Sequence, residues 1–170
     1  MKPVLPYARL AAATLVIAVL AGCFVGRNGE PEPGGPGGPD APAAPDPCQL
    51  LTSEEVQQVR GGVAKSGEEQ PGNLKGERAC RYDQTGSLAD IRIAVYPSTQ
   101  EYFDGEREAA RQNVPIEEID GLGDEAFIGA TVLFVHKGPF TMTMVVSGPE
   151  TEGEKRELVL KLGAIAAGRL

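Results

Sequence analysis

Few residues of this chain could take part in catalysis, and none forms a known catalytic arrangement. His136 is the only histidine, and no serine lies in the G-x-S-x-G motif that builds a nucleophile elbow. No paired carboxylates, Cys–His dyad or metal-ligand cluster emerges either. His136 would be the first candidate in a hydrolase, but on an alternating strand it shares a face with Val132 and Phe134, which is typical of a packing residue. We therefore expect no enzyme, no catalytic residue, no metal and no cofactor.

A glycine-rich stretch suggests two binding hypotheses, and neither fits. Gly121-Leu-Gly-Asp-Glu-Ala126 has the letters G-x-G-x-x-A of a dinucleotide-binding loop, which needs a strand before it and a helix after it. Here an acidic loop comes before it and a strand signal follows, and Asp120 and Asp124 would repel phosphate. The same carboxylates lack the spacing of a calcium-binding EF-hand loop. We predict a solvated turn that enters a strand.

Residues 1–22 have the features of a secretory signal peptide. Lys2 and Arg9 supply positive charge, residues 10–20 are almost entirely apolar, and small residues precede Cys23. A transmembrane anchor is the alternative, but the run is shorter than the ~20 residues of a spanning helix, and Gly and Pro follow it. Leu20-Ala-Gly-Cys23 resembles the bacterial lipobox. That resemblance implies that Cys23 is acylated and becomes the first residue of a mature, membrane-anchored protein.

After the signal peptide, residues 23–47 are predicted to form a lipidated, disordered tether. The segment is rich in Pro and Gly and has almost nothing that could pack. It would lift residues 48–170, which are long enough for one core, off the membrane as a single domain. The formal net charge of −8 becomes −10 once Lys2 and Arg9 are removed, which argues against binding to nucleic acid or to anionic headgroups.

With Cys23 assigned to lipid, two cysteines remain, Cys48 and Cys80. An even pair in an exported domain predicts a structural disulfide, which would pin the first helix to the sheet. A metal-binding pair or a redox pair is the alternative. Both are disfavoured because the chain has no C-x-x-C motif and its one histidine lies far along the chain.

The rest of the sequence predicts an α+β fold. Thr52-Ser-Glu-Glu55 has capping-box spacing and opens a helix to about residue 60, and residues 61–78 are expected to be a mobile loop. Short apolar and alternating runs predict strands at residues 79–84, 91–96, 124–129, 131–137 and 139–147. Further helices are predicted at residues 99–112, begun by Ser98, and at residues 152–167. The order α-β-β-α-β-β-β-α indicates an antiparallel sheet of about five strands packed with two or three helices.

One face of the last predicted strand is a candidate site for an apolar ligand. Phe140, Met142, Met144 and Val146 share this face, and methionine adapts to irregular ligands. Ordinary core packing beneath a helix explains the same alternation, and we favour that interpretation.

An ordered set of short motifs resembles a family of small actinobacterial lipoproteins that carry a domain of unknown function. After the lipobox come C-x-L-L-T from Cys48, A-C-x-Y from Ala79, and G-L-G-D-E-A from Gly121. Tyr82 stands where such proteins often have tryptophan. The resemblance implies an exported domain, anchored on the outer face of the cytoplasmic membrane, with a disulfide between Cys48 and Cys80. It implies no known activity.

Two functions from different classes remain. We favour a binding or interaction module of the cell envelope, held to the membrane through Cys23, that recognises a protein or cell-wall component and not nucleic acid. The tether, the acidic surface and the missing catalytic residues support it. The alternative is a carrier of an apolar or lipid ligand, held between helix and sheet against the face of Phe140, Met142, Met144 and Val146.

Overall fold

The computed structural model describes residues 40–85 and 89–170 of the chain. The predicted signal peptide, Cys23 and the tether up to residue 39 lie outside the described residues. The elements, in chain order, are η1 (Pro47–Gln49), α1 (Ser53–Arg60), β1 (Glu68–Pro71), β2 (Arg78–Asp83), β3 (Asp90–Pro97), α2 (Gln100–Asn113), β4 (Ile116–Glu118), β5 (Glu125–Gly129), β6 (Val132–Lys137), β7 (Phe140–Ser147) and α3 (Glu152–Arg169).

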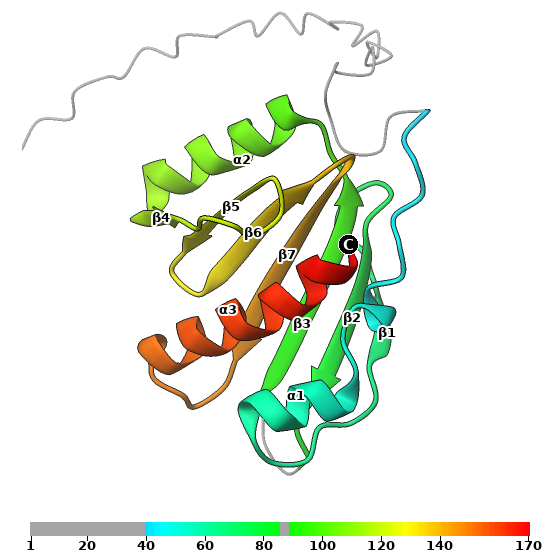
Figure 1. Cartoon of the computed structure of the whole chain (residues 1–170), viewed down its shortest axis with the longest axis vertical. Helices are drawn as coiled ribbons and strands as arrows, with labels where there is room; N and C mark the ends of the chain where they lie inside the picture. Colours follow the sequence, from blue (N-terminus) through cyan, green and yellow to red (C-terminus); the bar gives the residue numbers. More distant parts are fainter. Residues whose placement is uncertain (1–39, 86–88) are drawn as a thin grey trace, which may run out of the picture. The chain divides into compact units, whose positions relative to one another are not determined.

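The strands form one antiparallel sheet in the order β1-β2-β3-β7-β6-β5-β4 (Figure 1). The predicted α+β class is confirmed, but the sheet has seven strands rather than about five. The two unpredicted strands are its edges. β1 lies inside the segment expected to be a mobile loop and is polar, and β4 has only three residues. Neither is long or apolar enough to show a two-residue period, so both escaped the sequence pattern.

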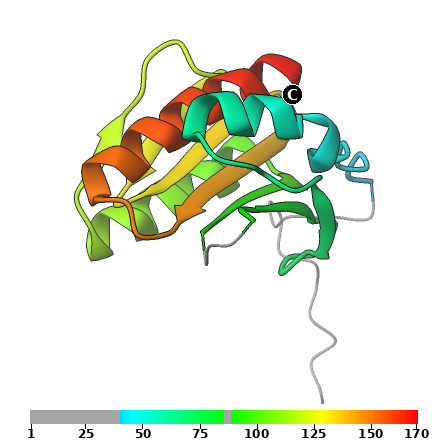
Figure 2. The same ribbon diagram turned by 90° about the horizontal axis from the view of Figure 1, so that it is seen from below.

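Two helices cover one face of the sheet and one covers the other. α1 and α3 lie together on the first face, and α2 lies on the second (Figures 1 and 2). α3 packs closest where it has Gly163, because a Cβ added there would collide with the side chain of Leu133 on β6. The main core lies between α3 and the sheet and includes Ile91, Ile93, Val95, Leu133, Val135, Met142, Met144, Val146, Val159, Leu162 and Ala166.

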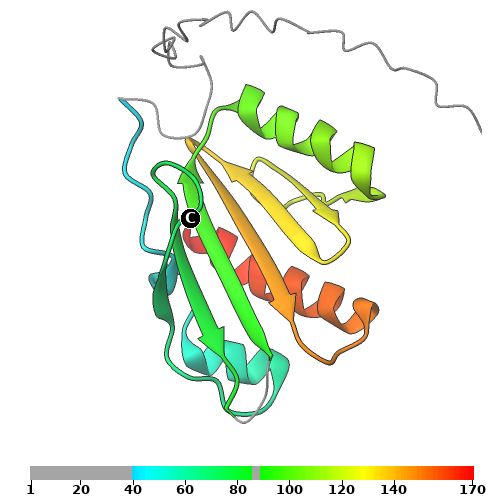
Figure 3. The same cartoon turned by 180° about the vertical axis from the view of Figure 1, so that it is seen from behind.

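On the second face, α2 is held mainly by aromatic packing. The fully buried ring of Phe103 stacks on His136, with centroids 5.2 Å apart, and lies 5.5 Å from the ring of Phe127. His136 is 4% exposed, and its Nδ1 lies 3.4 Å from the hydroxyl of Thr141. The prediction that His136 is a packing residue is confirmed. Figure 3 shows this face, with α2 on the side of β5 and β6 and away from β2 and β3.

The helices begin where polar side chains satisfy their first amides. Thr52 and Glu55 form the predicted capping box of α1. α2 begins one residue later than expected, because the hydroxyl of Thr99, not that of Ser98, accepts from the N–H of Tyr102. Thr151 begins α3 with a second capping box.

Candidate functional site

Cys48 and Cys80 are joined in a disulfide with an S–S distance of 2.07 Å, as predicted. The bond ties η1 to β2, and thus fixes the start of the domain to the sheet. Close by, the hydroxyl of Tyr82 donates to the carbonyl oxygen of Leu51 at 2.7 Å. Burial raises the pKa of Tyr82 to about 12. This region is a buried structural clamp.

The predicted apolar ligand face lies in the core. Met142, Met144 and Val146 are at most 2% exposed and pack with the side chains of α3, while Phe140 is half-buried at the rim. These four side chains are therefore arranged as ordinary core packing beneath a helix.

The acidic glycine-rich stretch forms a turn, as predicted. Gly121 and Gly123 have φ of +74° and +67°, values that favour glycine, and a strand rather than a helix follows. Asp124 fixes the turn, since its N–H donates to the carbonyl oxygen of His136 and its carboxylate accepts from the N–H of Gly138. Within the described residues, no three His, Cys, Asp or Glu side chains are placed to hold a metal ion.

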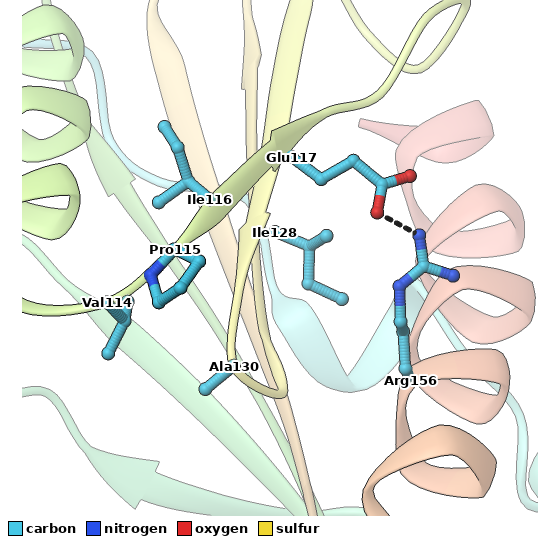
Figure 4. Close-up of a pocket in the computed structure, with 7 residues that line it drawn as sticks. All are labelled: Val114, Pro115, Ile116, Glu117, Ile128, Ala130 and Arg156. Carbon is cyan, nitrogen blue, oxygen red and sulfur yellow. Dashed lines mark hydrogen bonds and ion pairs between the residues drawn. The ribbon is translucent and has the colours of Figure 1, made fainter.

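A pocket of about 400 Å³ lies at the β4 edge of the sheet, at residues the sequence did not single out (Figure 4). Val114 caps the C-terminus of α2, and Pro115 ends any continuation of that helix and turns the chain into β4. The lining residues are Val114, Pro115, Ile116, Glu117, Ile128, Ala130 and Arg156. The lining is mostly apolar, and its two charged residues are Glu117 and Arg156.

The polar part of the pocket is one ion pair. Arg156 of α3 donates from Nη2 to Oε2 of Glu117 on β4 at 2.6 Å, and the two side chains point toward each other beside the pocket (Figure 4). Among the described residues that line the pocket, none is a serine, cysteine or histidine, and the one carboxylate, that of Glu117, is held in this ion pair.

The backbone beside the pocket is an open sheet edge. β4 pairs with β5, and no strand of the described residues lies on its other side. The N–H of Ile119 donates to the carbonyl oxygen of Ala126 at 2.9 Å. By the alternation of an antiparallel ladder, Glu117 therefore directs its N–H and C=O to β5, while Ile116 and Glu118 direct theirs outward. Donors and acceptors suited to an added strand thus lie next to the pocket.

Ala130 brings a strained backbone to the pocket. It lies in the tight turn between β5 and β6 with φ of +52°, the only positive φ of a non-glycine residue among those described. The left-handed conformation costs an alanine about 1–2 kcal/mol. The Cβ responsible for that cost belongs to a residue that lines the pocket.

A second cluster lies between α2 and β3. The hydroxyl of Tyr96 donates to Glu106, and burial together with the nearby carboxylate of Glu77 raises the pKa of Glu106 to about 7. Glu77 is itself bound by Arg92 at 2.7 Å, and the ring of Tyr102 stands edge-on to that of Tyr96. Glu106 can therefore change its charge near neutral pH.

Sequence reasoning named none of these residues as a site. Pro115 after a helix was the one available signal, and it indicates only where a helix ends. The pair of Tyr96 and Glu106 joins a strand to a helix, so it has no local spacing to detect.

Comparison with known proteins gives a family without a known activity. A family model described as "Protein of unknown function (DUF3558)" matches residues 18–132, about two thirds of the chain. The matched range includes both disulfide cysteines and most of the pocket lining, whereas Arg156 lies beyond it. No curated protein and no solved structure matches the chain. None of the helices in residues 40–85 and 89–170 is both long and apolar enough to cross a membrane.

Proposed function

Since this chain belongs to DUF3558, a family of proteins of unknown function, we propose a function from its own structure. It is a membrane-anchored, extracytoplasmic binding module that docks an extended polypeptide segment on the outer edge of β4. The observation that carries this proposal is the apolar pocket beside outward-facing backbone groups at one sheet edge. A docked strand would use the backbone of Ile116 and Glu118 for affinity and place one side chain in the pocket for specificity.

The two edges of the sheet differ in ways that favour β4 as the docking edge. β1 reads Glu68-Glu-Gln-Pro71, and the charges and proline are typical of an edge protected from pairing. β4 is short and charged, which limits indiscriminate pairing, yet it lies between hydrophobic lining residues. A short, charged edge strand beside an apolar pocket favours the addition of a specific strand over the addition of any strand.

The N-terminal end of the described domain and the pocket lie toward opposite edges of the sheet. The described chain enters the domain through η1, which contacts β1, β2 and β3. β4 lies six strand spacings from β1, or roughly 25–30 Å along the sheet. The pocket therefore lies away from η1, the described element nearest in sequence to the proposed lipid attachment at Cys23.

The test uses the full chain in detergent micelles and fluorescent peptides of the pattern X-Thr-X-Phe-X-Thr-X, with X as Lys, Ser or Glu. Glu118→Pro removes an outward N–H and no bond to β5, so it should abolish binding without unfolding the sheet. Glu118→Gln is the matched control, because it removes the same charge but keeps the N–H. Fluorescence anisotropy should show that the peptides bind to the wild type and to Glu118→Gln but not to Glu118→Pro. Binding of no peptide, or binding that survives Glu118→Pro, contradicts docking on this edge.

The alternative is a carrier of an apolar or lipid ligand, and the apolar lining of the same pocket favours it. Because Met142 and Met144 are buried by α3, a ligand between helix and sheet would have to enter by displacing core side chains. Native mass spectrometry of the full chain distinguishes the two functions. A heterogeneous extra mass lost on denaturation favours the carrier, and a single mass favours the binding module.

A further inference from the structure

We propose that the segment docked on β4 is basic, with one large apolar side chain flanked by lysine or arginine. This inference rests on the proposed function and names its partner chemistry. The partner is a polypeptide other than a second copy of this chain.

The charge at this edge of the domain is negative after every arginine has been counted. The stretch 117–125 contains five acidic residues, and the arginines that contact it are Arg107, Arg111 and Arg156. Each arginine already makes an ion pair, at 2.7 Å, 2.6 Å and 2.6 Å. Asp120 and Asp124 are exposed and make no ion pair with residues 40–85 or 89–170, so they leave a surplus of negative charge at the end of β4. A basic segment is attracted to such a surface, and an acidic one is repelled.

Glu117 remains available to a partner as well. Arg156 binds it through Oε2, and its side chain is 60% exposed. In an added strand, the residue opposite Glu117 would lie about 4.5 Å away between Cα atoms, since Glu117 is not hydrogen-bonded on that side. Opposite charges on such a cross-strand pair stabilise the pairing.

The same charges disfavour a second copy of this chain as the occupant. Antiparallel pairing of two β4 strands would bring Glu117 and Glu118 of both copies close together, and like charges across a ladder are destabilising. Both copies would also bring the acidic stretch 117–125. Anionic lipid headgroups meet the same repulsion.

The pocket explains the apolar part of the motif. Its lining by Val114, Pro115, Ile116, Ile128 and Ala130 offers hydrophobic contact, and its volume of about 400 Å³ has room for an aromatic ring. One buried anchor side chain within a polar rim is the usual arrangement of a binding hot spot.

The three peptides that test the function also test this inference, with the full chain as before. The Lys peptide should bind about tenfold tighter than the Glu peptide, with the Ser peptide between them. Raising NaCl from about 0.05 to 0.3 M should weaken the Lys peptide most. Replacing Phe by Gly in the Lys peptide should also weaken its binding to the protein.

Two protein variants separate a local charge effect from the overall charge. Asp120→Asn should weaken the Lys peptide about two- to threefold, whereas Glu68→Gln, the same loss of charge at the opposite edge, should change nothing. Equal binding of all three peptides, lost in Glu118→Pro, would overturn the basic partner and leave the strand-docking function standing. Equal effects of Asp120→Asn and Glu68→Gln would also overturn it. Binding of no peptide would overturn both proposals.

Discussion

The hydroxyl of Tyr96 donates to the carboxylate of Glu106, with O–O distances of 2.6 and 2.7 Å to its two oxygens. The bond joins β3 to α2, and its donor is a phenol rather than a cation. Burial, followed by the nearby Glu77, raises the pKa of Glu106 to about 7, and burial and Glu106 raise that of Tyr96. The folded protein therefore favours a neutral Glu106, whereas the unfolded chain releases that proton at ordinary acidic pH.

This pair predicts that stability falls as pH rises from about 4.5 to 7. Within that window the folded protein holds a proton on Glu106 that the unfolded chain has lost. Above pH 7 Glu106 is ionised in both states, so the loss of stability no longer grows. Glu106→Gln keeps a neutral side chain, so it should remove the fall and exceed the wild type at pH 8 by about 1–3 kcal/mol. Urea unfolding of both proteins at several pH values measures the free energy of unfolding. Parallel curves for the two proteins would contradict this assignment.

Tyr96→Phe is the matched control for the same pair. The hydrogen bond from Tyr96 lowers the pKa of Glu106, in opposition to burial. Without that bond the pKa should rise further, and the fall in stability should extend to higher pH. Opposite changes in the two variants would identify Glu106 as the titrating group.

The strained turn at Ala130 predicts a variant that gains stability and loses binding. Glycine adopts φ of +52° without the Cβ clash, so Ala130→Gly should raise the free energy of unfolding by about 0.5–1 kcal/mol. It also removes a methyl group from the pocket lining, so the affinity for the Phe-containing peptides should fall about two- to fivefold. Thermal unfolding and anisotropy measure the two effects. Gly138→Ala is the reciprocal control, because it introduces the same strain at φ of +57° away from the pocket.

The disulfide predicts a large change in stability. It closes a loop with a sequence separation of 32, and such a cross-link contributes about 2–4 kcal/mol. The double variant Cys48→Ala, Cys80→Ala should lose that amount in urea unfolding, and reduction of the wild type should reproduce the loss. The peptides should still bind at low denaturant, since the bond ties down η1 and not the β4 edge. Loss of peptide binding from a folded double variant would mean that the two edges are coupled.

Sequence pattern predicted the central elements of this fold and missed its edges. β3, β6 and β7 have the β-branched and alternating residues of half-buried strands, and the sequence located all three within two residues. β1 and β4 lack that signal because they pack on few side chains, and pairing with a neighbouring strand defines them. The acidic turn at Gly121 was predicted because its glycines and carboxylates act locally.

The candidate site was harder to predict than the fold, because its parts meet only in the folded chain. Glu117 and Arg156 are far apart in sequence, and the ion pair between them carries no local motif. Ile116 and Ile128 resemble ordinary core residues until β4 is known to be an edge strand. The unpaired backbone N–H and C=O groups of an edge strand leave no mark in the sequence, since every residue except proline carries both.

The proposed anchor is tested by Cys23→Ser in the full chain, expressed with its signal peptide in a bacterial host. One acyl chain holds a protein only marginally, but two or three add about 0.8 kcal/mol for each buried methylene and hold it firmly. The wild type should therefore remain in the membrane fraction after a high-salt wash and dissolve only in detergent, while Cys23→Ser should lose this firm attachment. Arg27→Ser, a nearby change in the tether, should leave the attachment intact. A Cys23→Ser variant that stays as firmly bound as the wild type would mean that residues 10–20 form a lasting apolar anchor.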